Sequence, residues 1–293
     1  MPGVVHSRQD VEVTEDRNLR AGRDYSLWPV LKWGHATRLA SGFVQDYQLW
    51  RIGLGMETRA EYSNNRRVVT FYASLATSPP VHEWSLRFGD ILHNYRSALD
   101  ALAWAMVNLD DNSPQPQYEK QIYFPMKRTL EAFDKEARTK LSSAPRFILE
   151  RMAMVQPFHV KPGEAVEDGI ALILHDLDIE DKHKAALEAQ AVAADMTSYS
   201  IRYRPADQEG WDDAGVMEPE WLAPDRPVEN GDPIVRWTFP APVEEAEVTE
   251  LPLRLLVRHR GKALDVFELL QLIDWQVGQT FAVIETGRFR SEE

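Results

Sequence analysis

The stretch from Glu83 to Leu109 constrains the fold of this chain more than any other. It contains no proline and a single glycine, and its apolar residues return every three or four positions, which predicts one long helix. At 100° per residue, one face of this helix carries eight apolar or aromatic side chains, which must be core: Trp84, Phe88, Ile91, Tyr95, Leu99, Leu102, Met106 and Leu109.

The opposite face of the predicted helix is polar in its middle and apolar toward both ends. Asp90 and Arg96 lie at its edges, and it carries Leu86, His93, Ser97, Asp100 and Trp104. A solvated face does not usually place large apolar side chains on either side of a polar patch. We therefore expect the helix to be packed on both sides and the polar group to be at least partly enclosed, which marks a candidate site without naming a reaction.

Composition and charge exclude several function classes. The formal net charge of −13 and the pI near 5.1 argue against broad affinity for nucleic acid or anionic membrane. The absence of cysteine excludes disulfides, thiolate metal sites and cysteine nucleophiles. No apolar run reaches the 18 or more residues of a membrane span, and the N-terminus lacks the apolar segment of a signal peptide. We expect a cytoplasmic protein with no membrane partner.

The pattern along the chain predicts an α+β fold. Residues 1–24 are polar and are expected to be an exposed arm, followed by a single domain over 25–293. A helix is predicted within 28–52, then a β-hairpin of Leu54–Glu61 and Arg67–Leu75 with a turn at 63–66. The long helix opens a helical bundle core over about 82–194.

Within this bundle, Thr129 is a predicted N-cap and Pro145 suits the first turn of the next helix. Val166–Ala194 is expected to be helical, with an interruption near Asp178. A small antiparallel sheet and a long helix are predicted over about 196–287: strands Tyr199–Arg204, Ile234–Phe239 and Leu253–Arg260, a surface loop at 206–232, and a helix from Ala263 to Thr286.

Four blocks in this order resemble an uncharacterised bacterial protein family: GDILHNYRSALDALAW at 89–104, IYFPM at 122–126, QPF at 156–158 and LHDLDIEDKHK at 174–184. The resemblance spans roughly residues 54–190, and the chain departs from the family pattern at 178–180. The family has no settled activity, so the resemblance singles out positions and no chemistry. Its polar motif positions are Asp90, His93, Asn94, Arg96, Ser97, Asp100, Asp181, Lys182 and His183.

The leading specific hypothesis is a metal-independent ribonuclease that resembles the HEPN class of helical proteins. That class places an arginine and a histidine four to six residues apart on a helix, often across a dimer. Arg87 and His93 fit this window, although Arg96 lies closer to His93 around the helix. An arginine would hold the scissile phosphate while the histidine moves the 2′-hydroxyl proton. RNA and a second copy of the chain would then be its partners.

Two alternatives remain open. Asp90-x-x-His93 and Glu180-x-x-His183 each place a carboxylate and an imidazole one turn apart, which is half of a di-metal carboxylate bundle. Otherwise the polar residues form a buried structural network in a binding or scaffold protein. No organic cofactor is expected, and the metal content stays open. The polar centre that we predict consists of His93, Arg96 and Asp100, with Asp181, Lys182 and His183 as its partners.

Overall fold

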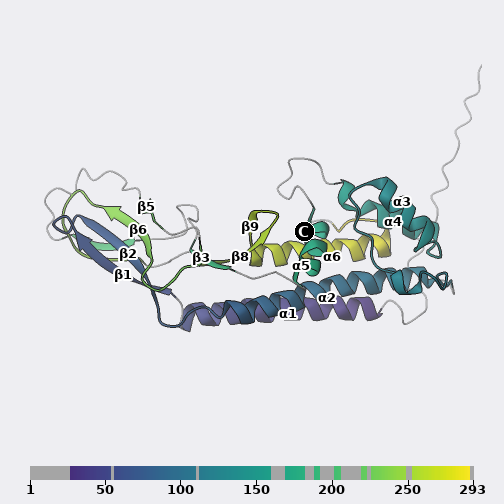
Figure 1. The fold of residues 1–293 in the computed structure, drawn as a ribbon, viewed down its shortest axis with the longest axis horizontal. Coiled ribbons are helices and arrows are strands. Elements are labelled where there is room, and N and C mark those ends of the chain that lie inside the picture. Colours follow the sequence, from purple (N-terminus) through teal and green to yellow (C-terminus); the bar gives the residue numbers. More distant parts are fainter. Residues whose placement is uncertain are drawn as a thin grey trace, which may run out of the picture.

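The computed structural model describes residues 27–53, 56–109, 112–159, 169–181, 188–191, 201–205, 219–222, 226–248 and 253–290. Its longest helices run along the long axis of the molecule (Figure 1). The strands between residues 56 and 75 and between 220 and 238 lie beyond one end of these helices, and α3 and α4 lie toward the other end. The helices are α1 (Leu27–Gly53), α2 (Val81–Val107), α3 (Leu130–Thr139), α4 (Arg146–Met154), α5 (Ile170–Asp181) and α6 (Val266–Thr286), with short 3₁₀ turns at Glu119–Gln121 and Pro157–His159.

The α+β fold class is confirmed, with an N-terminal hairpin and a long C-terminal helix. The strands are β1 (Met56–Ser63), β2 (Val68–Leu75), β3 (Glu188–Ala191), β4 (Ile201–Pro205), β5 (Glu220–Trp221), β6 (Pro233–Thr238), β7 (Val243–Val248), β8 (Leu253–His259) and β9 (Lys262–Asp265). They form antiparallel ladders in the orders β1-β2-β6-β5, β3-β8-β9 and β4-β7.

The predicted hairpin turn lies at the expected residues. Asn64, Asn65 and Arg66 adopt positive φ angles of 49°, 51° and 63°, a region that asparagine tolerates better than most residues. Arg66 is held there by its own side chain, whose guanidinium lies 4.0 Å from the Tyr62 ring centroid and donates to the Val243 carbonyl at 2.8 Å. The turn therefore also ties the hairpin to β7.

The expectation of one C-terminal sheet was wrong in its pairing. The three strands predicted to form it lie in three different ladders, as β4, β6 and β8. Two further expectations also need correction. Glu188–Ala191, expected at the end of a helix, is a strand that pairs with β8, and Glu220–Trp221, expected in a loop, pairs with β6. The expected arm at 1–24 lies outside the described residues.

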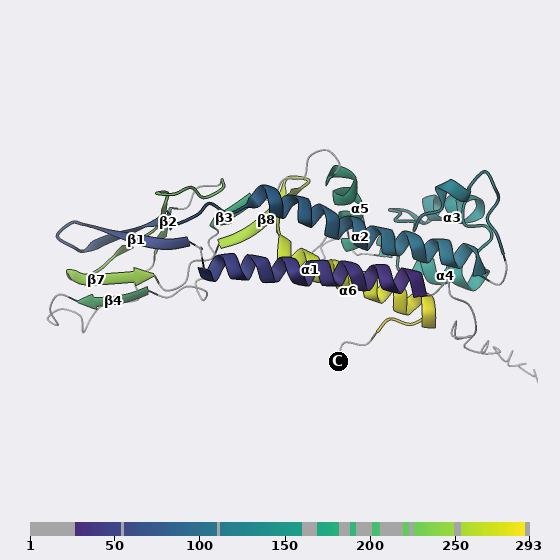
Figure 2. The same cartoon turned by 90° about the horizontal axis from the view of Figure 1, so that it is seen from below.

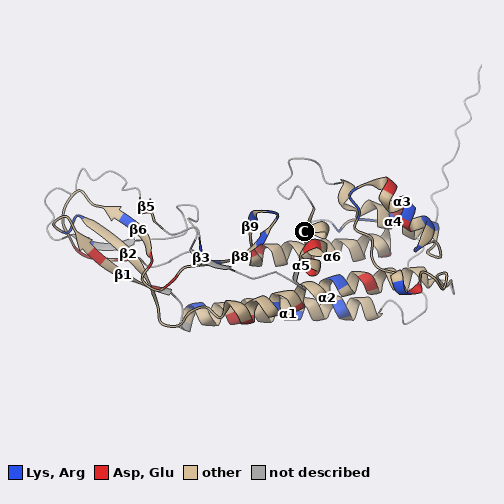
Figure 3. Cartoon of the chain, viewed as in Figure 1, with Lys and Arg blue, Asp and Glu red and all other residues tan. Residues whose placement is uncertain are grey.

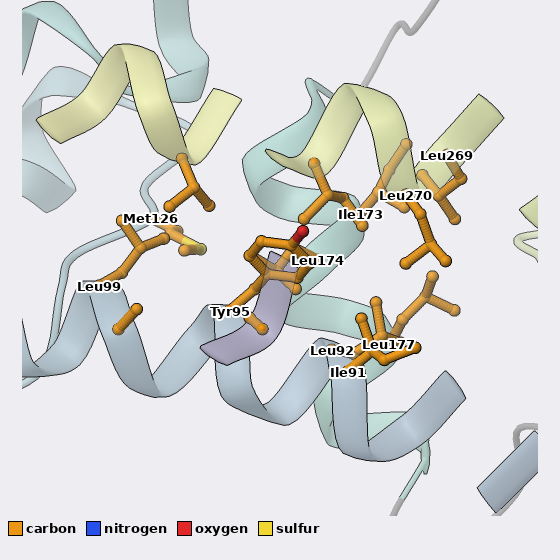
Figure 4. Packing of buried hydrophobic residues seen from close by; sticks show 14 of the residues in the cluster. Ile91, Leu92, Tyr95, Leu99, Met126, Ile173, Leu174, Leu177, Leu269 and Leu270 are labelled. Carbon is orange, nitrogen blue, oxygen red and sulfur yellow. The ribbon is translucent and has the colours of Figure 1, made fainter. Parts of the chain in front are cut away.

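The helical core is built around α2, whose predicted buried face is confirmed. Tyr95 is fully buried, and Figure 4 shows it with Ile91, Leu92 and Leu99 facing apolar side chains of α5 and α6, among them Leu174. α1 runs antiparallel to α2 on its other side, where Trp50 and Trp84 meet edge to face at 5.4 Å. Figure 2 shows α1, α2 and α6 lengthwise beside one another.

The expectation that α2 is packed on both sides was wrong at the apolar residues that flank the polar patch. Leu86 is 74% exposed and Trp104 is 37% exposed.

Acidic and basic residues are interspersed along α1 and α2 (Figure 3). Among the described helices, none combines the length and the apolarity needed to cross a lipid bilayer.

Candidate functional site

Arg96 is the buried centre of the predicted polar group. Its guanidinium, on the α2 side facing residues 122–126, donates to the Phe124 carbonyl at 2.8 Å and to the Met126 sulfur at 2.8 Å. One turn further along α2, Asp100 Oδ1 lies 2.7 Å from Arg96 Nη2. Arg96 is only 6% exposed. Its buried positive charge is therefore satisfied by these partners within the fold.

Asp100 joins the same segment to α2 from the edge of the cluster. Its Oδ1 accepts the Phe124 amide hydrogen at 2.9 Å, and its side chain is about a third exposed. Burial raises the pKa of Asp100, and the opposing influences of Arg96 and the Phe124 amide only partly offset this. Asp100 and Arg96 thus satisfy both backbone groups of Phe124.

The conspicuous sequence blocks meet in space. Phe124 of the IYFPM block forms backbone hydrogen bonds with Arg96 and Asp100, which belong to the block at 89–104 on α2. Gln156 of the QPF block donates from Nε2 to the Pro125 carbonyl at 2.9 Å, and its Oε1 accepts the Lys127 amide hydrogen at 3.0 Å. Gln156 is 2% exposed. Arg96 and Asp100 of α2 and Gln156, which follows α4, therefore fix one irregular segment, which explains why these blocks carry polar residues at these positions.

His93 lies next to this network but faces outward. Its Nδ1 lies 3.2 Å from Asp178 Oδ1 on α5, and the exposed fractions of the two side chains are 62% and 10%. His93 therefore contacts α5 through Asp178, which was not among its predicted partners. Asp181 is the last residue of α5 and its side chain lies outside the described part of the chain, as do Lys182 and His183.

Sequence reasoning missed His175 and Asp178 as members of this cluster. His175 has a buried Nδ1 without a hydrogen-bond partner among the described residues. Burial lowers its pKa, and the positive charge of Arg96 lowers it further. The sequence did contain an indication of this. His175 and Asp178 are spaced i, i+3, and each directly follows a leucine that is buried, Leu174 and Leu177.

Asp176, on another side of α5, connects the helix to the β8–β9 turn. Its Oδ2 lies 3.2 Å from His259 Nε2 and accepts from Arg260 at 2.6 Å. His259 is 4% exposed. Asp176 and Asp178, two residues apart on different sides of α5, therefore place one carboxylate against the sheet and the other against α2.

Among the other residues named for catalysis or metal binding, those with described side chains have different partners or face solvent. Arg87, the arginine in the HEPN-like spacing, forms an ion pair with Asp46 of α1. Asp90 and His93 are both exposed. Across the described ranges, no group of three or more His, Asp and Glu residues could hold a metal ion. Glu180 and His183 have no described side chains, so the di-metal alternative stays a prediction.

A second polar node joins three helices. Asp274 Oδ1 on α6 accepts from Trp33 Nε1 at 2.8 Å, Thr37 Oγ1 at 2.7 Å and the Tyr95 hydroxyl at 3.0 Å. Burial raises the pKa of Tyr95, and the Asp274 charge raises it further, which keeps the phenol a donor. The Asp274 carboxylate therefore acts as a structural acceptor that links the three helices.

Comparison with known proteins adds no assignment. No family model matches the chain, no curated protein matches it, and no solved structure matches it. The resemblance to a bacterial family therefore stays a prediction, and the function has to be argued from the geometry.

Proposed function

We propose that this chain is a binding or scaffold protein and that the cluster around Arg96 is a structural network. The supporting observation is the direction of Arg96. Its guanidinium is buried and contacts Phe124, Met126 and Asp100, all within the fold. An arginine that grips a scissile phosphate has to present its N–H groups to the substrate. Arg96 instead holds residues 122–126 on α2.

The network is tested by removing Asp100. Asp100→Ala deletes an acceptor for the Phe124 amide and leaves Arg96 buried without its carboxylate. Breaking a fully buried pair costs about 3–5 kcal/mol. Because Asp100 is a third exposed, we expect about 2 kcal/mol of destabilisation, which corresponds to a Tm lowered by about 4–8 °C. Thermal and urea unfolding followed by circular dichroism measure both quantities.

Asp100→Asn is the informative partner variant, because it keeps an oxygen that can accept from Arg96 and Phe124. Burial raises the pKa of Asp100, which means that the fold disfavours its charged form, so removing the charge costs little stability. We expect Asp100→Asn to lose less than half of the stability that Asp100→Ala loses. Asp134→Ala serves as the surface control, since its contact with Arg138 is long at 3.7 Å and solvated. A stability of Asp100→Ala equal to that of the parent protein would contradict the structural role.

A second candidate function rests on the His93–Asp178 pair. A buried carboxylate contacts Nδ1 of an exposed imidazole, which leaves Nε2 accessible for proton transfer. We propose metal-independent RNA cleavage as this second candidate. His93 would accept the 2′-hydroxyl proton, the 2′-oxygen would attack phosphorus, and the 5′-oxygen would leave with a proton from water.

The corresponding experiment uses a single-stranded RNA oligonucleotide with excess EDTA. We expect products with 2′,3′-cyclic phosphate and 5′-hydroxyl ends, and loss of cleavage in His93→Ala. His82→Ala removes another exposed histidine of α2 and should cleave as the parent does. A DNA oligonucleotide of the same sequence should stay intact, because it lacks the 2′-hydroxyl. RNA that stays intact with the parent protein rules this candidate out.

A further inference from the structure

A groove between α1 and α2 lies apart from the His93–Asp178 pair. Its volume is about 460 Å³, within the range of about 300–1,000 Å³ that small-molecule sites occupy. The lining residues Ser97, Asp100 and Trp104 follow one face of α2. Trp28 and Lys32 come from the first turns of α1, and Ile122 comes from the segment that Arg96 and Asp100 hold in place.

The polar centre of this groove is a positioned ammonium group. Lys32 Nζ donates to Ser97 Oγ at 2.5 Å and lies 5.7 Å from the Trp28 ring centroid. Within the described chain, Lys32 has no carboxylate partner. An ammonium carries three donors, and only one is used by Ser97. The remaining donors are available to an anion inside the groove.

The nearby carboxylate does not neutralise this ammonium. Asp100 Oδ1 is engaged by Arg96 at 2.7 Å and by the Phe124 amide at 2.9 Å. The charges of Arg96 and Asp100 therefore balance each other, and Lys32 contributes one net positive charge at the groove. This single positive charge suits a monoanion better than a phosphate dianion, which more cations would have to balance.

Two large aromatic side chains border the same groove. Trp28 is 61% exposed and Trp104 is 37% exposed. Tryptophan is usually highly buried, and accessible indole rings beside a charged centre offer stacking surface to a flat ligand. The groove therefore combines one anion-binding centre with aromatic walls.

We propose that this groove binds a small aromatic monocarboxylate, with its carboxylate on Lys32 and Ser97 and its ring against Trp28 and Trp104. The inference rests on the proposed binding function and names its ligand class.

The probe is 4-fluorobenzoate, followed by ¹⁹F NMR as protein is added to it, and 4-fluorobenzamide is its neutral counterpart. We expect saturable broadening of the benzoate signal and at least about tenfold weaker binding of the amide, because the amide cannot form the charge-assisted bond. Lys32→Gln should weaken benzoate binding about tenfold. Lys32→Arg, which keeps the charge, should bind within about threefold of the parent.

Matched controls separate the groove from general charge and hydrophobicity. Lys135→Gln removes the same charge from an exposed position on α3 and should bind as the parent does. Trp104→Ala should weaken binding about tenfold, whereas Trp275→Ala removes a 50% exposed tryptophan from α6 and should have no effect. Circular dichroism confirms that each variant is folded.

Three results would overturn the assignment: no saturable broadening with the parent protein, unchanged affinity in Lys32→Gln, or equal binding of the amide. The broader binding or scaffold proposal is judged separately by the stability of the Asp100 variants. A destabilised Asp100→Ala together with a silent probe therefore rejects the ligand class alone.

Discussion

At the scale of single residues, the informative positions are polar groups that the fold encloses. His175 illustrates this. Its Nδ1 is buried and has no hydrogen-bond partner in the described structure, and burial followed by the charge of Arg96 lowers the pKa of its imidazole. The sequence places it beside Asp176, which favours a solvated interpretation, and nothing local to residue 175 reports the presence of Arg96 on another helix.

His175 makes the stability of the protein depend on pH. Because its folded-state pKa lies below the unfolded value of about 6.5, its contribution is fully present above pH 6.5. It is lost as the pH falls from there through the lowered folded-state pKa, since the unfolded chain takes up the proton first. We expect His175→Gln to show a smaller drop in Tm between pH 7.5 and pH 5.5 than the parent protein.

Differential scanning calorimetry at both pH values measures this drop. The Tm difference between parent and variant at pH 8 isolates the packing change, because histidine is neutral there in both states. Asp100 acts in the opposite direction, since its raised pKa favours the folded state only at pH values below that pKa. An unchanged pH dependence in His175→Gln would contradict the buried-histidine interpretation.

At the scale of elements, the close contact between α1 and α6 depends on a glycine, Gly278 of α6, which packs against Trp33 of α1. A Cβ on Gly278 would lie 3.0 Å and 3.2 Å from ring carbons of Trp33. Trp33 cannot easily move away, because its ring stacks on Phe281 at 5.2 Å and its Nε1 donates to Asp274. Gly42 on α1 is the opposite case, with nothing within 4 Å of its Cβ position.

The two glycines give a matched pair of variants. Gly278→Ala should destabilise the protein by about 1 kcal/mol, because overpacking against Trp33 outweighs the better helix propensity of alanine. Gly42→Ala should stabilise it by about 0.5–1 kcal/mol, because only the propensity changes. Urea unfolding of both variants measures the difference. A stabilised Gly278→Ala would show that Trp33 yields, contrary to its fixed position.

The elements also show what the sequence could predict. Helical periodicity identified the buried face of α2, and turn chemistry identified the hairpin at Asn64 and Asn65, because both signals are local. The end of α5 was not predictable in this way. Glu188–Ala191 is a strand because it pairs with β8, more than 60 residues later, and helical spacing in 166–194 carries no information on that partner. In the site, the spacing predicted Arg96 with Asp100, but the partner of His93 had to come from the fold.

At the scale of the whole molecule, two hydrophobic clusters organise the described chain. The larger one surrounds α2. The smaller one joins Val69 and Phe71 of β2 to Val235 of β6, with Phe239, Val243, Ala246 and Val248. The sequence predicted both the hairpin and the later strand, but assigned them to separate sheets. Alternating apolar residues define which face of a strand is buried, and they do not define which other strand covers it.

The pairing of β2 with β6 also has a consequence for how each molecule is made. Thr70 and Arg236, which face each other across this pair, are separated by 166 positions. At about 5–20 residues per second, a ribosome needs roughly 8–33 s to bridge that interval. Throughout it, the emerging hairpin exposes the backbone edge of β2, which is a template for pairing with other chains. Neighbouring ribosomes on one messenger hold identical edges close together, so the speed of translation through residues 76–238 sets how long each nascent chain is open to mispairing.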